Sequence, residues 1–306
     1  MGVGKGMKKE FRDVFLNKYG YYELIEDARA EQRKEFFESE YYQNSMSVYE
    51  KNYTKEELEY LKNKLEQKEF ILRKRLDKEK KNYTLLDIGC GEGFALSHFQ
   101  ESGFEVTGID FSKAGVLQHN SHMADCIVVG DCEEILPAWK EEGRKFDVIN
   151  IDSTLEVTVN PQKIVTLCRE ILEDDGVLLI KAANNYSPWQ QHLLEEGKLA
   201  DTYWLDKGGG RHLSFFNKAG LLCFMEHLGY ECVDLLGDSF IDFNLANQDT
   251  NYYQKQGVGK NCYRAHVDIE NFMHALSVEK SVEVFRAMGA MGIGRRLIGI
   301  FRVKKE

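Results

Sequence analysis

The sequence predicts an α/β fold, in which a largely parallel sheet is covered by helices on both faces. Short apolar runs alternate with helical stretches from residue 83 onwards. Such alternation is typical of βαβ units, whose parallel strands need helical cover on both sides. The first apolar run ends in a glycine cluster at 89–93, the usual place of a ligand-binding turn at the carboxyl edge of a parallel sheet. With 306 residues, of which 43% are hydrophobic, the chain can bury a sizeable core.

Residues 1–82 precede this pattern and are expected to form an N-terminal helical region, rich in Lys, Glu and Tyr. Thr54 and Glu57 match a capping box, which marks a helix start. The aromatic residues before it are expected to pack against the next domain or to line a ligand cleft: Tyr41, Tyr42, Tyr49 and Tyr53. Leucines at near-helical spacing then predict an amphipathic helix of about 25 residues, namely Leu58, Leu61, Leu65, Leu72 and Leu76. We expect its charged residues to face solvent, with a dimer contact as the alternative.

Residues 83–239 form the main α/β domain. Strands are expected at 83–88, 105–109, 126–129, 146–151, 176–182 and 231–236, with helices near 94–101, 113–120, 161–172 and 217–228. Asn217 suits the N-cap of the last of these helices, and Gly229 lies just past its end. Residues 240–294 follow as an insertion with a polar, Asn-rich first half and a helical second half. Residues 295–306 contain the last strand, at 298–303.

The glycine cluster has the spacing Asp87-x-Gly89-x-Gly91-x-Gly93 at the end of the first strand. A dinucleotide fingerprint would place a pyrophosphate at the following helix N-terminus, and the carboxylate of Asp87 would repel it. The carboxylate favours a ligand with cationic groups. S-adenosylmethionine carries a sulfonium and an α-amino group and no phosphate, so the pattern indicates this cofactor.

Two further acidic residues follow the next two strands. Asp110 ends the second strand, where its carboxylate can accept hydrogen bonds from ribose hydroxyls or, alternatively, cap the next helix. The third strand is followed by Gly130-Asp131-Cys132, where the carboxylate can accept from an adenine amino group and the next N–H can donate to the ring. Phe111 and Ile135 are candidates for the apolar walls of the adenine slot.

These motifs, in this order and at these intervals, resemble the class I S-adenosylmethionine-dependent methyltransferases. The resemblance covers residues 83 to about 239 and the last strand. It implies a Rossmann-like seven-stranded mixed sheet whose last strand runs antiparallel between its neighbours. It also implies an enzyme that transfers a methyl group from S-adenosylmethionine, with a cofactor site formed by Asp87, Gly89, Cys90, Gly91, Asp110, Phe111, Asp131, Cys132 and Asp152.

A closer resemblance links three further stretches to one group of bacterial methyltransferases. Residues 183–190 (ANNYSPWQ) resemble the PND[FY]SPLQ motif of this group, residues 211–216 (RHLSFF) its pD-H-[LI]-x-[YF]-F motif, and residues 242–245 and 249–252 its insertion. Ala183 replaces the usual Pro, and Arg211 replaces an acid, so no carboxylate directly precedes His212. Such proteins look like tailoring enzymes of surface polysaccharides or activated sugars, which implies a small carbohydrate acceptor.

Candidate acceptor residues follow the fourth and fifth strands, at the carboxyl edge of the sheet. His212 follows three glycines at 208–210 and is the candidate general base, with a structural role in the loop as the alternative. Asn184 and Asn185 could bind acceptor hydroxyls or serve turn formation. Glu156 and Asp152 follow the fourth strand, and Glu156 is expected to bind the acceptor. No second carboxylate matches Asp152, so no metal site is expected.

Composition limits the partners and the location of the chain. With 40 Lys and Arg against 50 Asp and Glu, the net charge of −10 counts against a broad nucleic-acid surface. Residues 150–153 (NIDS) also lack the [DN]-P-P-[YF] pattern with which amino-methylating DNA enzymes hold a flipped base. The seven cysteines show no zinc spacing and no long apolar run occurs, so we expect a cytoplasmic protein without a membrane span. A nucleic-acid or protein methyltransferase, or a cofactor-binding protein without turnover, is the alternative.

Overall fold

Seven strands form the central mixed sheet in a computed structural model of the protein, which describes residues 11, 13–25, 52–76, 80–208 and 212–305. From one edge to the other they are β5 (Ile127–Val129), β4 (Phe104–Asp110), β3 (Tyr83–Ile88), β6 (Phe146–Asp152), β7 (Leu172–Ala183), β10 (Arg296–Val303) and β9 (Tyr230–Asp238). The strands β3 to β7 are parallel, and β10 runs antiparallel between β7 and β9. The predicted seven-stranded sheet with an antiparallel last strand is therefore confirmed.

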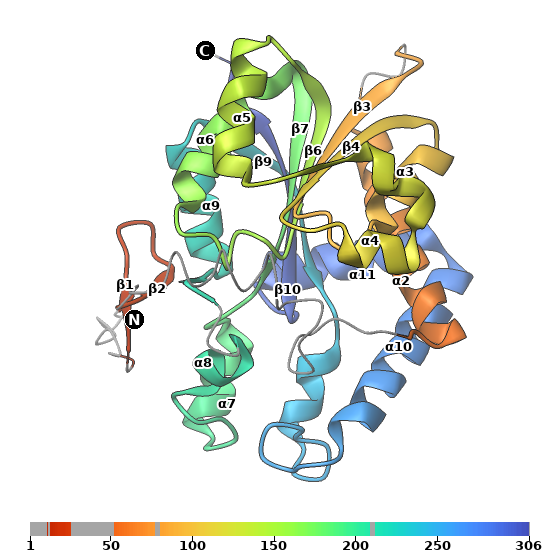
Figure 1. Ribbon diagram of the computed structural model, residues 1–306. Coiled ribbons are helices and arrows are strands. Elements are labelled where there is room, and N and C mark those ends of the chain that lie inside the picture. The colour runs from red at the N-terminus through yellow and green to blue at the C-terminus, as the bar shows by residue number, and fades with distance from the viewer. Residues whose placement is uncertain (1–10, 12, 26–51, 77–79, 209–211, 306) are drawn as a thin grey trace.

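Helices cover both faces of this sheet (Figure 1). One face carries α5 (Cys132–Glu141), α6 (Pro161–Ile171) and α9 (Lys218–His227). The other carries α2 (Lys55–Arg73), α3 (Phe94–Glu101), α4 (Ala114–His119) and α11 (Val278–Met291), and the short η2 (Ser121–Cys126) follows α4. Neighbouring strand residues alternate between the faces, since Leu86 and Ile149 pack on the first side and Leu85 and Val148 on the second. Both sides are buried, which explains why the central strands read as continuous apolar runs.

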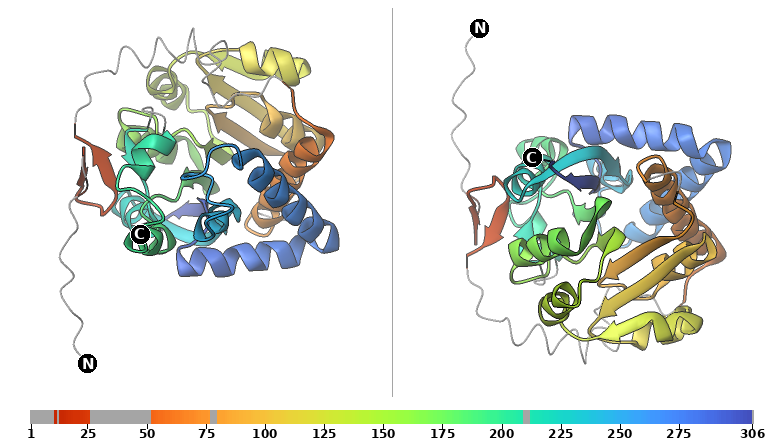
Figure 2. Two further views of the ribbon diagram at one scale, coloured as in Figure 1. Left: turned by 90° about the horizontal axis from the view of Figure 1, so that it is seen from below. Right: turned by 90° about the horizontal axis from the view of Figure 1, so that it is seen from above.

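A smaller layer lies beyond the carboxyl ends of the parallel strands (Figures 1 and 2), and we refer to it as the cap. It consists of α7 (Pro188–Glu195), α8 (Tyr203–Gly208), η3 (Ile241–Ala246) and the first part of α10 (Gly259–Leu276). A separate apolar cluster holds it together, in which Tyr186, Leu193, Trp204 and Leu245 are buried. The rest of α10 runs along α2. The cap thus faces the sheet edge at which the glycine cluster ends β3.

Predicted and observed elements agree closely in the main domain. The strand expected at 83–88 has these bounds, and the strand expected at 105–109 is one residue longer at each end. β7 begins at Leu172 rather than at 176. The insertion at 240–294 contains η3 in its polar half and α10 and α11 in its helical half. In the part of the chain that the structure describes, no helix is both long and apolar enough to cross a bilayer.

The N-terminal region departs from the prediction of a helical region over residues 1–82. β1 (Val14–Leu16) and β2 (Tyr22–Leu24) form an antiparallel hairpin, and β2 also pairs with β8 (Ser214–Phe215). The helical prediction is therefore wrong for 14–24. The turn explains the difference, because the side chain of Asn17 accepts from the N–H groups of Tyr19 and Gly20, and Gly20 has a φ of +90°.

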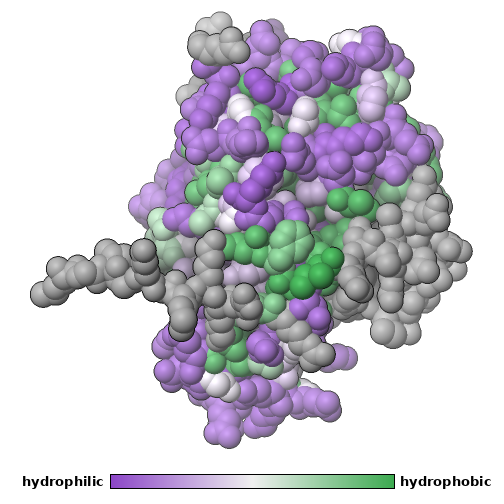
Figure 3. Space-filling model, turned by 90° about the vertical axis from the view of Figure 1, so that its left-hand side faces the viewer, coloured by the Kyte–Doolittle hydropathy of each residue, from purple (hydrophilic) through white to green (hydrophobic). Residues whose placement is uncertain are grey.

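Aromatic and apolar side chains of this region have mixed surroundings. Tyr53 packs against Phe94 and His119, with 5.6 and 5.3 Å between ring centroids. The other tyrosines of the predicted cluster lie outside the described residues: Tyr41, Tyr42 and Tyr49. Three apolar side chains of the hairpin region are exposed: Phe15, Leu16 and Ile25. Figure 3 shows this side of the molecule, where apolar surface interrupts the hydrophilic surroundings.

α2 confirms the predicted helix start but not the predicted exposed face. Thr54 and Glu57 form the capping box, and the helix ends at Arg73 after 19 residues. Leu58, from the predicted apolar stripe, is 44% exposed, whereas the side chains of Lys64 and Lys68 are only 11% and 4% exposed. The prediction that the charged residues of this helix face solvent is therefore wrong for these two lysines. They turn inward because the sheet edge beneath them carries carboxylates.

Candidate active site

The glycine cluster forms the turn between β3 and α3, as predicted. Gly89, Gly91 and Gly93 have φ values of +75°, +54° and +75°, a region that glycine enters without strain. A Cβ at Gly89 would also collide with the side chain of Thr154. Gly93 is the N-cap of α3 and has no side chain to cap it, so the first N–H groups of the helix open onto the turn. The N–H groups of Gly89, Gly91 and Gly93 are themselves bonded within the protein, so it is the first turn of α3 that offers backbone donors to a closely approaching ligand.

Asp110 ties this turn to the end of β4. Its Oδ2 accepts from the N–H of Gly91 (2.8 Å) and its Oδ1 from the N–H of Ser112 (3.1 Å). The N-cap of α4 is Lys113, so the alternative prediction that Asp110 caps this helix is wrong. Burial raises the pKa of the Asp110 carboxyl, although backbone N–H donors oppose the rise. Hydrogen bonding of this carboxylate to ribose hydroxyls stays a prediction.

Asp87 lies near the end of β3 and is 2% exposed. Its Oδ1 accepts a hydrogen bond from the side-chain amide of Asn150 on β6 (2.5 Å). Burial raises the pKa of this carboxyl to about 7, and the amide of Asn150 and the ammonium group of Lys68 oppose the rise. A cationic ligand group beside Asp87 would favour its ionised form. The site therefore fits the ammonium and sulfonium groups of S-adenosylmethionine.

The other predicted cofactor residues lie around the ends of β3, β4 and β5. Asp131 is the N-cap of α5 and accepts from the N–H of Glu133 (2.9 Å). Ile135 lies against Gly130, close to the predicted adenine slot. Two cysteines and one aromatic ring complete this set, with the cysteines buried and the ring half-buried: Cys90, Cys132 and Phe111. Their contacts with adenine stay predictions.

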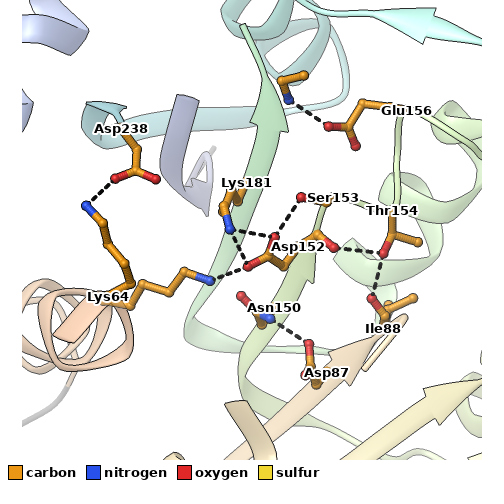
Figure 4. A network of polar contacts seen from close by, with 12 residues as sticks. Lys64, Asp87, Ile88, Asn150, Asp152, Ser153, Thr154, Glu156, Lys181 and Asp238 are labelled. Atoms are coloured by element: carbon orange, nitrogen blue, oxygen red, sulfur yellow. Dashed lines mark hydrogen bonds and ion pairs between the residues drawn. The ribbon is translucent and has the colours of Figure 1, made fainter. Parts of the chain in front are cut away.

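A row of polar and charged side chains crosses five adjacent strands at the edge of the sheet where the parallel strands end (Figure 4). Residues paired in register, or two apart on one strand, point to the same face of a sheet. Asp87 pairs with Asn150, Asp152 with Lys181, and Arg296 with both Ala183 and Asp238. All of them therefore point to the face that α2 covers. We call this set the charged row: Asp87, Asn150, Asp152, Lys181, Arg296 and Asp238.

α2 places two ammonium groups over the charged row. Lys68 lies 2.7 Å from Asp152, which also pairs with Lys181 at 3.1 Å. Lys64 forms ion pairs with Asp238 and Glu270. Burial would raise the pKa of Asp152, but the ammonium groups of Lys181 and Lys68 hold it well below its usual range. Asp152 is therefore a firmly ionised group between two lysines, and its predicted contact with the cofactor stays a prediction.

Four basic residues of this site are missing from the sequence-based prediction: Lys64, Lys68, Lys181 and Arg296. A signal in the sequence indicates only Lys181. It interrupts the apolar run at 176–183 within β7, and a charge in a buried strand is costly unless it has a function or a partner. Lys64 and Lys68 lie on the same side of α2 as the ring of Tyr60, but the burial of this ring is seen only in the structure.

Glu156 connects the end of β6 to the end of β7 and to the segment of His212. Its Oε1 accepts from the N–H of Ala183 (2.6 Å), and its backbone carbonyl accepts from the N–H groups of Leu213 (2.7 Å) and Ser214 (3.1 Å). Burial raises the pKa of the Glu156 carboxyl. Its Oε2 is buried and has no hydrogen-bond partner among the described residues. His212 is half-buried one residue before this contact, and its role as a base stays a prediction.

The two asparagines after β7 differ in their surroundings. The amide of Asn184 donates to the carbonyls of Gly292 (2.9 Å) and Gly294 (3.0 Å), so it holds the turn before β10. The backbone N–H of Asn185 donates to Phe216 (2.7 Å), and its side-chain Nδ2 has no partner among the described residues. Acceptor binding by either asparagine stays a prediction. The turn function expected as the alternative describes Asn184 well.

Arg295 lies beside these groups, since its carbonyl accepts from the N–H of Asn184 (3.0 Å). Its Nε is 3.8 Å from Asp242 on η3. Its Nη1 is buried and lacks a hydrogen-bond partner among the described residues. We use the name acceptor-side polar atoms for Glu156 Oε2, Asn185 Nδ2 and Arg295 Nη1. They comprise two donors and one oxygen at the end of the sheet next to the cap.

Comparison with known proteins shows similarity to methyltransferases. A family model described as a methyltransferase domain matches residues 58–235, more than half of the chain. The ubiquinone biosynthesis O-methyltransferase of Pasteurella multocida (strain Pm70) is 28% identical over 165 residues, which cover 50% of this chain and 67% of that protein. The protein of the same name from Glaesserella parasuis serovar 5 (strain SH0165) is 30% identical over 162 residues, or 51% of this chain and 68% of that protein.

The chain thus spans about two thirds of the length of these relatives. A solved structure of an S-adenosylmethionine-dependent methyltransferase from Archaeoglobus fulgidus aligns with a TM-score of 0.48 and 16% identity. That alignment covers 78% of this chain and 93% of the other.

Proposed function

Because the chain belongs to the methyltransferase domain family and uses S-adenosylmethionine as methyl donor, we propose that its acceptor is a hydroxyl of a small carbohydrate. The acceptor would be a sugar or a nucleotide-activated sugar of surface polysaccharide biosynthesis. The resemblance of residues 183–190 and 211–216 to sugar-tailoring enzymes motivates this choice.

The acceptor-side polar atoms support the proposal most directly. Buried polar atoms are almost always hydrogen-bonded in proteins, so three without described partners, on residues at or beside the end of β7, point to a ligand that supplies them. A sugar ring carries several hydroxyls, each of which both donates and accepts. It could satisfy the amide and guanidinium donors as well as the carboxyl oxygen. An apolar ring would leave them unpaired, at a cost of about 1–3 kcal/mol for each group.

Methyl transfer needs the donor sulfur, the methyl carbon and the acceptor oxygen in one line. When bound, S-adenosylmethionine supplies an electrophilic methyl group, whose C–S bond breaks as the C–O bond forms, and the sulfur keeps the electron pair. Asp87 would bind the cationic end of the cofactor, and Asp110 the ribose. The acceptor-side polar atoms would orient the acceptor hydroxyl, and such positioning contributes several kcal/mol to the rate enhancement.

The proton of the acceptor hydroxyl must also leave. His212 is the proposed base, because its segment is held at the end of β6 by the carbonyl of Glu156. A histidine accepts a proton near neutral pH, and such a base contributes about 10²–10⁴-fold to a rate.

A second candidate acceptor is the phenolic hydroxyl of a quinone precursor. The name of the two relatives, ubiquinone biosynthesis O-methyltransferase, favours it. Charged and unpaired polar groups at the acceptor side count against a largely apolar ring.

A transfer assay with isotope-labelled S-adenosylmethionine distinguishes the candidates. The panel contains free sugars, nucleotide-activated sugars, a catechol with an apolar chain, and RNA. We expect label in a sugar or nucleotide-activated sugar. Label only in the catechol would overturn the proposal in favour of the second candidate, and label only in RNA would overturn both.

Two variants connect the assay to the site. Asn185→Ala should lower kcat/KM for the sugar by about tenfold, because one hydrogen bond to the acceptor is lost, while the cofactor Kd stays constant. Gln191→Ala is the matched control, since that amide already donates to the carbonyl of Tyr186. Equal effects of the two substitutions would contradict the role of the acceptor-side polar atoms.

A further inference from the structure

The charged row is unevenly balanced along its length. At the β9 end, one ammonium group, that of Lys64, faces two carboxylates, Asp238 and Glu270. In the middle, one carboxylate, Asp152, faces two ammonium groups, Lys68 and Lys181. Among the ion pairs, carboxylates therefore outnumber ammonium groups at the β9 end, whereas ammonium groups outnumber carboxylates in the middle.

Arg296 adds a third positive charge to the middle of the row. It is paired in register with Ala183 and Asp238 at the start of β10. Its guanidinium forms no ion pair and no hydrogen bond with any described residue, although Asp238 and Asp152 act on it at longer range. The two carboxylates that act on Arg296 are thus already ion-paired with lysines, Asp152 with Lys68 and Asp238 with Lys64.

The titration of Lys181 agrees with this surplus. Burial lowers the pKa of Lys181 to about 8. The carboxylate of Asp152 opposes the change, whereas the positive charges of Arg296 and Lys68 add to it. An ammonium group with carboxylate neighbours and no positive neighbours would be stabilised in its charged form instead.

These groups also face accessible space. The side chains of Asp152 and Lys181 keep 30% and 16% of their surface exposed, and Arg296 is half-buried. The whole chain carries a net charge of −10, so the surplus is local to this edge and contrary to the overall field. A buried or half-buried excess of positive charge is costly unless an anion neutralises it.

We propose that Lys181 and Arg296 bind an anionic group, a carboxylate or phosphate, of the acceptor. The proposal rests on the proposed function and narrows its acceptor to an acidic or phosphate-bearing carbohydrate. Guanidinium and ammonium groups side by side suit such an anion, because the first offers a planar pair of donors and the second a compact charge. The α-carboxylate of the cofactor is the other possible source of the same chemistry.

Pyrophosphate serves as the probe, and the protein is saturated with S-adenosylhomocysteine so that the carboxylate position of the cofactor is already filled. Titration calorimetry should show pyrophosphate binding to this complex. Arg296→Gln should weaken it about 10- to 100-fold, as expected for loss of hydrogen bonds to a charged group, and Arg296→Lys should restore part of the affinity. Lys181→Met should also weaken pyrophosphate binding, and this second variant tests the proposal if Arg296→Gln does not fold.

Arg302→Gln is the matched control on the same strand, since Arg302 donates to the carbonyl of Arg75 at the other end of β10. It should leave pyrophosphate affinity unchanged. No binding of pyrophosphate, or equal affinity in the Arg296→Gln and Arg302→Gln variants, would overturn the proposal. Binding that occurs only without S-adenosylhomocysteine would also overturn it, because the anion would then belong to the cofactor. If the acceptor is not a carbohydrate, the transfer assay with the acceptor panel shows this independently of pyrophosphate binding.

Discussion

The two halves of the sheet edge are built from contacts of very different sequence separation. In the cofactor half, formed by β3, β4, β5 and the glycine turn, Gly91 and Asp110 are 19 residues apart. In the acceptor half, formed by α2, β7, β9, β10 and the cap, Lys68 meets Asp152 across 84 residues and Lys64 meets Asp238 across 174. A short motif can therefore specify the first half, whereas only the complete fold assembles the second.

The largest expected effect tests whether His212, on the acceptor side, takes part in catalysis. His212→Ala should lower turnover by about 10²–10⁴-fold if His212 takes the proton of a hydroxyl acceptor. The Kd of S-adenosylhomocysteine should hardly change, because the histidine acts on the acceptor side. Steady-state kinetics and calorimetry measure the two quantities.

A stable His212→Ala enzyme with a near-normal rate on an identified hydroxyl acceptor would end the general-base proposal. His192→Ala on α7 is a control outside the sheet edge, and it should leave turnover nearly unchanged.

The next effect concerns the inward face of α2. Lys64→Met leaves the carboxylates of Asp238 and Glu270 buried without their cation, which should lower the free energy of unfolding by about 3–5 kcal/mol. Lys62→Met is the matched control: its side chain is 69% exposed and faces Glu66 at 3.6 Å, so the change should stay within about 0.5 kcal/mol. Urea unfolding at pH 7 measures both.

Adding Glu270→Gln to Lys64→Met should recover part of the loss, because one uncompensated charge is removed. If Lys62→Met and Lys64→Met lower the free energy of unfolding by the same amount, the inward face of α2 does not stabilise the acceptor half.

The difference in sequence separation between the cofactor half and the acceptor half also explains what could be predicted from the sequence. The strand bounds, the glycine turn and the antiparallel last strand depend on local patterns of apolar residues and glycines, and they were predictable. The capping box at Thr54 was predictable for the same reason. The hairpin at 14–24 depends on the local turn at Asn17 and Gly20 and on the pairing of β2 with the distant β8, and the helical prediction for residues 1–82 used neither.

The site residues divide in the same way. The N–H of Gly91 donates to Asp110, and Asp87 lies near the end of β3, the positions that the motif implies. Lys64 and Lys68 could not be assigned from α2 alone, because lysines four residues apart look the same over a charged sheet edge as they do in solvent. Hydrophobic periodicity indicates which face of a helix is buried only when the surface beneath it is apolar.

A third effect tests the cofactor half. Asp110→Ala should weaken binding of S-adenosylmethionine by about 2–4 kcal/mol, because two charge-assisted hydrogen bonds to ribose are lost. The glycine turn would also lose its contact at Gly91. Asp110→Asn keeps one acceptor oxygen, so its Kd for S-adenosylmethionine should lie between those of the wild type and the alanine variant. Calorimetry gives the three Kd values, and an unchanged Kd in Asp110→Ala would show that Asp110 serves only the turn.

The smallest expected effect links the cofactor half to pH through Asp87. Its pKa of about 7 in the folded protein lies above the ordinary value of 3.8. The contribution of the Asp87 carboxyl to the free energy of unfolding is therefore fully present below pH 4 and is lost as the pH rises towards 7. The reason is that the unfolded chain releases this proton at a lower pH than the folded protein does. Cofactor binding has the opposite dependence, since the ammonium and sulfonium groups prefer the ionised carboxylate.

The Kd of S-adenosylmethionine should consequently fall about tenfold between pH 5.5 and 7, with a proton released on binding at the lower pH. Asp87→Asn cannot ionise, so its Kd should be weaker and independent of pH over this range, and its stability should no longer decrease between pH 4 and 7. Calorimetry in two buffers of different ionisation enthalpy counts the released protons. A pH-independent Kd in the wild type would mean that the cationic end of the cofactor lies away from Asp87. The middle of the charged row, rather than the glycine turn, would then have to orient the cofactor.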